Sequence, residues 1–319
     1  MVVSDMFYCV APMMGKTDSF FCYLLNLVNK KTLVYTEMMH AESIIRTNIL
    51  ENYNILNNLS NVAIQIAGSD PRRLALAAKK AENYGFNEIN INCGCPSKRV
   101  VSGSFGINLL LNPSLVRECV EEIKNKVSKQ VSIKTRIGVD SQTSDNVLDY
   151  FLIELNKEYI NKYIIHARIA IRGKLNTKDN LSVPSLNYER VFRLKEKFKG
   201  NKIIINGGFK NTDYNKEVFK NIDGIMIGRE AYKNPWMFNK NINSNDIDKK
   251  KKIIYLYLSF LKNNFQKHLF NKNSLLHIQN IFNGYKGAKN WRQKVAIAIQ
   301  NKDLNDLLKF IDCDNINRI

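Results

Sequence analysis

The amino-acid sequence predicts an α/β fold, a (β/α)8 TIM barrel followed by a small C-terminal helical bundle. Short β-branched runs alternate with amphipathic stretches through about the first 235 residues, and a polar or glycine-containing cluster follows each run. After residue 240 the pattern changes to helical periodicity. Strands that alternate with helices pair in parallel, and eight such units fit a closed barrel better than a doubly wound sheet.

The eight predicted strands are Phe7–Val10, Leu33–Tyr35, Val62–Ile66, Glu88–Ile91, Val131–Lys134, Tyr163–Ile165, Lys202–Ile205 and Gly224–Ile227. Amphipathic segments that lie between the strands are expected to form helices, and Pro71–Tyr84 is one example. Proline suits a first helical turn, and the leucine and alanines of this stretch share one face.

A linker at Asn241–Asp248 divides the chain into a barrel, residues 1–240, and a helical part, residues 241–319. In the first expected helix, Ile253, Tyr257, Phe260 and Leu261 fall at the spacing of one helical face. Three further short helices are expected, at Ser274–Phe282, Lys289–Ile299 and Asp303–Ile311.

Composition narrows the class of protein. Lysine and arginine number 48 against 29 acidic residues, a net charge of +19, which favours a polyanionic partner such as nucleic acid. An excess of Lys, Asn and Ile, as AT-rich coding produces, is an alternative source of part of this charge.

The longest apolar stretch, Ile253–Leu261, falls far short of the roughly 20 residues that span a membrane. With no targeting segment evident, we expect a cytoplasmic protein.

The six cysteines are scattered, so reduced thiols are expected. Cys93 and Cys95 are close together, but no second pair or histidine cluster completes a zinc set, and we expect no metal site.

The C-terminal strand ends of such a barrel form one mouth, where chemistry takes place. Asn206, Gly207 and Gly208 follow the seventh strand, and Gly228 and Arg229 follow the eighth. A glycine pair can simply turn the chain, but two such clusters at successive late strands favour binding of a phosphorylated cofactor through backbone N–H groups.

Three other strand ends carry groups suited to a planar ring. Lys134 and Arg136 point the same way from one strand, and a cation there could stabilise negative charge on a bound ring; a surface ion pair is the alternative. Gln65 could bind an amide-like edge, and His166 could donate a hydrogen bond, unless both are satisfied within the core.

Cys95 lies at a strand end before a loop that contains Gly103 and Gly106. A free thiol has a pKa of about 8.5, so Cys95 could act as a proton donor at neutral pH. The alternative is an inert buried side chain.

In this order and at these strand ends, the residues resemble the tRNA-dihydrouridine synthases, FMN-dependent barrel enzymes, through nearly the whole chain. The matching stretches are Ala11–Met14, Tyr35–Met38, Gln65–Gly68, Asn90–Ser97, Lys134–Arg136, His166–Arg168, Asn206–Gly208, Gly228–Tyr232 and Asn234–Pro235. The stretches Ala167–Pro184 and Gly284–Arg292 look like the subfamily that modifies uridine 20 and 20a of the tRNA D-loop.

The resemblance implies that Cys95 protonates uracil C5 while reduced FMN delivers hydride to C6, and that NADPH is the reductant. NADPH would dock transiently, in agreement with the missing GxGxxG fingerprint. The implied cofactor-binding residues are Pro12, Met13, Met14, Gln65, Lys134, His166, Asn206, Gly207, Gly208, Gly228 and Arg229. The expected RNA-binding residues are Asn92, Arg136, Arg168, Lys286 and Arg292.

The resemblance also implies a tRNA-binding role for residues 241–319, and we expect a monomer that binds neither DNA nor membranes. Four residues depart from the family pattern: Gly15 and Lys16 after the first strand, Lys98 after Cys-Pro-Ser, and Leu181 where arginine is usual. Two alternatives remain open, an FMN barrel oxidoreductase acting on a small molecule and an RNA-binding chaperone that has lost catalysis. Also open are the exact uridine, the choice between NADPH and NADH, and the oligomeric state.

Overall fold

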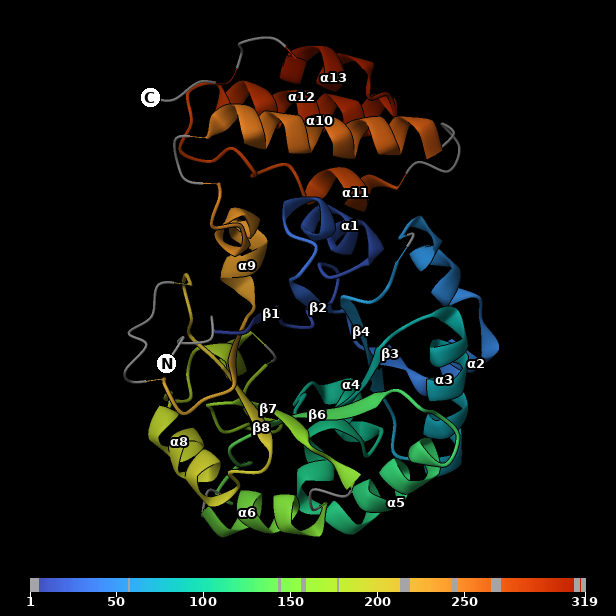
Figure 1. The fold of residues 1–319 in the computed structure, drawn as a ribbon, viewed down its shortest axis with the longest axis vertical. Helices are drawn as coiled ribbons and strands as arrows, with labels where there is room; N and C mark the ends of the chain where they lie inside the picture. The colour runs from blue at the N-terminus through green and yellow to red at the C-terminus, as the bar shows by residue number, and fades with distance from the viewer. Residues whose placement is uncertain are drawn as a thin grey trace.

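The computed structural model describes residues 6–312 and 316, apart from residues 57, 143–144, 156–158, 177, 213–218, 243–245 and 265–270. In this part of the chain a parallel sheet closes into a barrel (Figure 1). The ring consists of β1 (Tyr8–Val10), β2 (Leu33–Tyr35), β4 (Val62–Ala67), β5 (Glu88–Cys93), β6 (Gln130–Arg136), β7 (Lys162–His166), β8 (Lys202–Asn206) and β9 (Gly224–Ile227). Pairing of β2 with β4 completes it, so the TIM-barrel prediction is confirmed.

One strand was not predicted. β3 (Met39–His40) pairs in parallel with Ile66 and Ala67, the last two residues of β4. Its two residues are too few to show an alternating pattern, which explains why the sequence gave no signal.

The helical elements up to residue 238 cover the barrel. They are α1 (Ser19–Val28), α2 (Ala41–Arg46), η1 (Ile49–Ile55), α3 (Pro71–Tyr84), α4 (Lys98–Ser102), η2 (Gly106–Leu111), α5 (Pro113–Lys124), α6 (Asp145–Glu154), η3 (Asp179–Leu181), α8 (Tyr188–Lys197), α9 (Arg229–Lys233) and η4 (Pro235–Phe238). α3 has the predicted bounds because Asp70 accepts a hydrogen bond from the Arg73 N–H at 2.8 Å, and Gly85, with φ of 105°, ends the helix.

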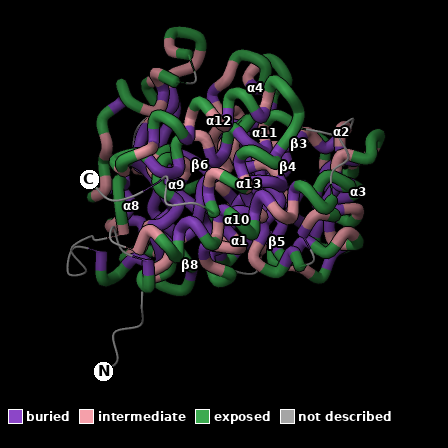
Figure 2. The backbone as a smooth tube through the Cα atoms, turned by 90° about the horizontal axis from the view of Figure 1, so that it is seen from above, coloured by how far each residue is buried: buried purple, intermediate pink, exposed green. Residues whose placement is uncertain are grey.

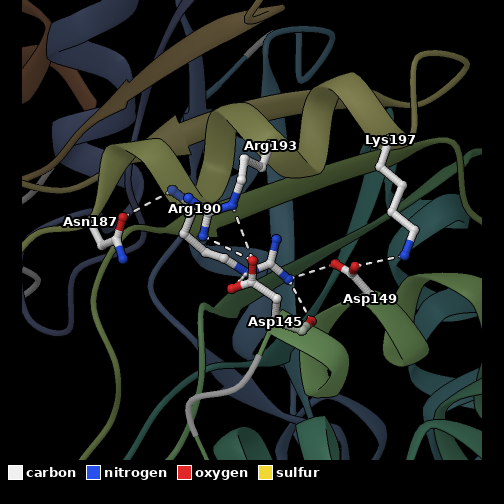
Figure 3. Close-up of polar contacts among 6 residues, drawn as sticks. All are labelled: Asp145, Asp149, Asn187, Arg190, Arg193 and Lys197. Carbon is white, nitrogen blue, oxygen red and sulfur yellow. Dashed lines mark hydrogen bonds and ion pairs between the residues drawn. The ribbon is translucent and has the colours of Figure 1, made fainter.

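Ion pairs join two of the outer helices, α6 and α8 (Figure 3). Arg190 and Lys197 of α8 both contact the Asp149 carboxylate of α6, at 2.6 and 2.8 Å. Asn187 begins α8 by accepting a hydrogen bond from the backbone N–H of Arg190. These contacts fix the end of the long β7–α8 loop, residues 167–187.

The barrel interior is unusually polar on one side. Along β5, Glu88, Asn90 and Asn92 alternate with Ile89 and Ile91, and these isoleucines pack in the large apolar core. Buried backbone fills the centre of the molecule, with exposed residues at its periphery (Figure 2). Polar side chains therefore line the inner face of β5 and need partners there.

An ion pair fills the end of the barrel where the strands begin. The Lys162 ammonium lies 2.6 Å from the Glu88 carboxylate, and both side chains are more than nine-tenths buried. Tyr35 and Ser132 donate hydrogen bonds to the same carboxylate at 2.7 and 2.6 Å. The buried Glu88 carboxylate is thus paired with a cation and accepts two further hydrogen bonds, which together offset the cost of removing its charge from water.

The chain ends in four described helices, α10 (Ile247–Asn264), α11 (Lys272–Leu276), α12 (Ala288–Asn301) and α13 (Asn305–Asp312). They lie together beside α1 and α9 (Figure 1). The predicted division at residue 240 falls between η4 and α10, although α10 begins two residues inside the predicted linker. No described helix is long and apolar enough to cross a membrane.

The predicted helix Ser274–Phe282 is wrong beyond Leu276, where the chain continues in turns. Two tryptophan side chains use carbonyls of this segment. Trp291 donates to the Ile278 carbonyl at 2.8 Å and Trp236 to that of Ile281 at 3.2 Å. These carbonyls accept hydrogen bonds from side chains elsewhere in the sequence. Local periodicity cannot reveal such partners.

Side chains of the barrel and of the helical part meet at one polar cluster. The Asp18 carboxylate accepts from the Phe21 N–H at 3.0 Å, which begins α1, and also contacts His277 Nε2 at 2.8 Å. His277 Nδ1 lies 3.1 Å from the hydroxyl of Tyr232 in α9. The departing residue Lys16 places its ammonium 4.5 Å from the Tyr232 ring centre, so it packs at this junction.

Candidate active site

Cys95 follows β5 in a tightly held turn. The side-chain oxygen of Asn92 accepts hydrogen bonds from the backbone N–H groups of Gly94 and Cys95, at 3.1 and 3.0 Å. The Cys95 carbonyl accepts from the Ile107 N–H at 3.1 Å. The Cys95 thiol is half-buried and lies 3.4 Å from the Ser97 hydroxyl. The turn, residues 94–97, is called the Cys95 loop below.

Below this loop, buried amides form a continuous network. Asn92 donates to the Gln65 side-chain oxygen at 2.8 Å, and Gln65 donates to Asn90 at 2.7 Å. Asn90 in turn donates to the hydroxyl of Ser132, which reaches Glu88. Gln65, predicted to bind a cofactor, and Asn92, predicted to bind substrate, are therefore both engaged with neighbouring side chains.

Positive charge gathers around His166. Burial lowers the pKa of His166 well below its usual value, and the charges of Arg136, Lys134, Arg168 and Arg229 lower it further. His166 is thus neutral at neutral pH and can donate only as an uncharged imidazole. Four cations near one buried ring suit an anionic ligand.

Lys134 and Arg136 of β6 lie beside the Cys95 loop. Lys134 pairs with Asn92 in the parallel ladder, and Arg136 donates to the Gly94 carbonyl. Burial, reinforced by repulsion from Arg136, lowers the pKa of Lys134 from 10.5 to about 7. Burial lowers the pKa of Arg136 to about 10, so Arg136 keeps its charge at neutral pH.

The Lys134 shift predicts a pH dependence of stability for the ligand-free protein. Between pH of about 7 and about 10.4 the unfolded chain holds the lysine proton more tightly than the folded chain, so stability rises with pH. Below a pH of about 7, Lys134 is charged in both the folded and the unfolded chain, so the full cost of desolvating its charge lowers the stability of the folded protein. Lys134→Met should therefore be more stable than wild type near neutral pH, by a margin that shrinks as pH rises toward 9, at up to about 1.4 kcal/mol per pH unit. Urea denaturation of both proteins across this range measures the margin, and a constant difference would contradict the assignment.

The glycines predicted to bind phosphate offer backbone donors. Gly207 and Gly208 follow β8 with φ of 126° and 74°, a conformation that favours glycine. In the described part of the chain, the N–H groups of Gly207, Gly208 and Gly228 have no hydrogen-bond partner. Gly207 is buried, so its unpaired N–H is one that a ligand would satisfy.

The other residues predicted near these glycines are placed as follows. The sulfur of Met13 lies near Gly228, within 3.9 Å of where a Cβ would be, and Pro12 is half-buried beside it in the chain. Met14 is 64% exposed. The Asn206 amide donates to the Met226 carbonyl at 2.8 Å, and exposed Arg229 reaches the Leu181 carbonyl at 3.4 Å.

Two arginines predicted to bind RNA donate hydrogen bonds to backbone carbonyls. Arg136 donates to Gly94 at 3.1 Å and to Ile169 and Asn180, each at 2.9 Å. Arg168 donates to the carbonyls of Ser182, at 3.3 Å, and Pro184. Its Nε is buried and has no partner in the described chain.

The residues that organise the β7–α8 loop gave no sequence signal. Asn180 is fully buried, accepts from the Ile171 N–H at 2.8 Å and donates to the Ile171 carbonyl at 2.9 Å. Arg172 contacts Asp140 and Asn108 at 2.8 and 2.9 Å. The burial of Asn180 depends on how the loop folds, so no local pattern in the sequence could have revealed it.

Lys286 and Arg292, the other two predicted RNA-binding residues, belong to the C-terminal helical part and not to the barrel. Lys286 is exposed, and Arg292 is half-buried and donates to the Asn283 side chain at 2.9 Å. No cluster of three or more histidine, cysteine or acidic side chains that could hold a metal ion occurs among the described residues.

Comparison with known proteins gives consistent matches. The dihydrouridine synthase (Dus) family model matches residues 9–315. The chain is 36% identical over 293 residues to the tRNA-dihydrouridine(20/20a) synthase of Synechocystis, covering 90% of this chain and 87% of that protein. It is 38% identical over 297 residues to the protein of the same name in Yersinia pestis, covering 91% and 85%.

Two solved structures share the fold. One is a morphinone reductase mutant in complex with tetrahydroNAD, with a TM-score of 0.50 and 11% identity over 72% of this chain and 85% of that chain. The other is a 2-naphthoyl-CoA reductase complex with 2-naphthoyl-CoA, with a TM-score of 0.52 and 9% identity over 72% and 48%. At such identities the likeness concerns the barrel alone.

Proposed function

The chain belongs to the dihydrouridine synthase family, and we propose that it reduces D-loop uridine of tRNA, at position 20 or 20a, to dihydrouridine. FMN is the proposed bound cofactor and NADPH the reductant. The observation that carries the proposal is the adjacency of three strand ends. Lys134 pairs with Asn92 of β5, three residues before Cys95, and Arg136 pairs with His166 of β7.

The mouth fits a flavin mononucleotide. The unpaired N–H groups of Gly207, Gly208 and Gly228 suit a phosphate. The side chains of Lys134 and His166 have no hydrogen-bond partner in the described chain and could bind the polar edge of the ring. When bound and reduced, FMN supplies the hydride for uracil C6.

Cys95 supplies the matching proton, to C5 of the same bond. The half-buried thiol is held at the mouth by its backbone, and the hydroxyl of Ser97 is its neighbour. Once Cys95 has given up its proton, the thiolate lies within electrostatic range of Lys134 and Arg136. These cations favour the ionised product of the transfer.

RNA binding has a physical basis in charge. A uridine must leave the folded RNA to reach the mouth, at a cost of a few kcal/mol. The net charge of +19 favours phosphate contacts that offset this cost. We assign residues 1–240 to the catalytic barrel and residues 241–319, with Lys286 and Arg292, to tRNA binding in a cytoplasmic monomer.

The purified protein should carry a yellow flavin spectrum and, with NADPH, convert uridine 20 or 20a of an unmodified tRNA transcript to dihydrouridine. Mass spectrometry of nuclease fragments locates the product. A flavin-loaded protein that oxidises NADPH but leaves the RNA unchanged would favour a small-molecule oxidoreductase. A protein that binds tRNA but takes up no FMN in excess would favour a chaperone.

A further inference from the structure

Two side chains hold the peptide between Gly94 and Cys95 from different directions. Asn92 accepts from both N–H groups of the pair, and Arg136 donates to the Gly94 carbonyl. A side chain at Gly94 has little room, because a Cβ would lie 3.2 Å from the Thr135 backbone. The position of Cys95 relative to β6 is therefore set by these contacts.

Arg136 also connects this turn to a second loop. Its Nη1 donates to the carbonyls of Ile169 and Asn180, which both belong to the β7–α8 loop. Arg136 is 3% exposed, and in the described chain it pairs with no carboxylate. Only backbone carbonyls from two separate loops compensate for the burial of this guanidinium, which makes it a link between them.

We propose that Arg136 and Asn92 are positioning residues that hold the Cys95 thiol at the mouth, with Arg136 fixing the Cys95 loop and the β7–α8 loop to each other. Both residues are also predicted RNA ligands, and turnover kinetics distinguish the two roles. Its catalytic consequence rests on the proposed function, whereas the placement of Cys95 does not.

Labelling of Cys95 tests the placement directly. Native protein is treated with iodoacetamide, and the extent of modification at Cys95 is followed by peptide mass spectrometry. Arg136→Lys keeps the positive charge but cannot reach three carbonyls with one ammonium. We expect Cys95 in this variant to be labelled at least about threefold faster, because the turn loses its restraint.

Arg168→Lys is the matched control. Among the described residues, the Arg168 side chain donates hydrogen bonds to the carbonyls of Ser182 and Pro184, both in the β7–α8 loop, and to none in the Cys95 loop. Its replacement should leave the labelling rate of Cys95 unchanged. Equal acceleration in both arginine variants would show general loosening of the mouth and overturn the specific role of Arg136.

Asn92 gives an independent test should Arg136→Lys fold poorly. Asn92→Asp retains an oxygen acceptor for the two N–H groups, and Asn92→Ala removes it. Labelling should accelerate in the alanine variant and return toward the wild-type rate in the aspartate variant. The same rate in both variants would overturn the positioning role of Asn92.

Turnover separates positioning from RNA binding. A displaced thiol should lower kcat of Arg136→Lys by about 100-fold while KM for tRNA stays within about threefold of wild type. A rise in KM with unchanged kcat and unchanged labelling would make Arg136 an RNA ligand. If wild-type protein forms no dihydrouridine, the proposed function fails, and the labelling experiments still decide the positioning role.

Discussion

Replacing Cys95 with alanine is expected to lower dihydrouridine formation by about 10²–10⁴-fold, the usual contribution of a positioned general acid. Folding and FMN content should stay at the wild-type level, because Cys95 is held through its backbone and, in the described chain, its thiol hydrogen-bonds to Ser97 alone. Single-turnover reduction of unmodified tRNA, with the flavin spectrum recorded on the same sample, measures both quantities.

Cys119→Ala is the control for loss of a thiol. Cys119 is buried in the covering helix α5, and its sulfur lies 3.9 Å from the Ser69 carbonyl. This variant should keep wild-type turnover per folded molecule. Wild-type turnover in Cys95→Ala would remove Cys95 from the mechanism, and loss of flavin together with activity would assign it to cofactor binding instead.

The second large effect is on stability. Lys162→Met should lower the free energy of unfolding by about 3–5 kcal/mol, because the Glu88 carboxylate would remain buried without its cation. The Glu88–Lys162 contact is 2.6 Å long inside the barrel, and Tyr35 and Ser132 hold the carboxylate in place. Chemical denaturation of wild type and variant gives the difference.

A surface pair provides the comparison. Lys233 contacts Glu230 at 2.8 Å with its side chain 68% exposed, so Lys233→Met should cost no more than about 1 kcal/mol. The double variant Glu88→Gln/Lys162→Met removes both charges and keeps an acceptor for Tyr35 and Ser132. It should recover much of the loss, and a double variant as unstable as Lys162→Met alone would show that packing, not charge, dominates.

Sequence reasoning succeeded where local pattern determines structure. The barrel strands and α3 were predicted close to their observed bounds, because β-branched runs and a capped amphipathic stretch carry their own signals. The family was predicted from ordered motifs and is confirmed by the family model and the relatives. In α10, Tyr257 and Leu261 are buried, and Ile253 and Phe260 pack against the core as partly buried side chains, in agreement with their spacing. Ile254 and Leu258 are also buried and extend this face.

Reasoning from sequence failed where the partner is distant backbone. The turns after Leu276 depend on tryptophan donors from elsewhere in the chain. Likewise, nothing in the sequence indicates that Arg136, two residues after Lys134, donates to the carbonyls of Gly94 and Asn180. Carbonyls occur at every residue, so no motif records which of them a side chain will bind.

Contacts of α1 and η4 with the C-terminal part limit how this chain can be divided. Tyr23 packs against Phe260 with ring centres 4.1 Å apart, Phe21 packs against His277, and Trp236 donates to the Ile281 carbonyl. A protein truncated after residue 240 would present these three aromatic side chains to water, and such surfaces promote aggregation. The two parts should therefore be expressed and engineered as one unit, because the barrel produced without the C-terminal part would tend to aggregate.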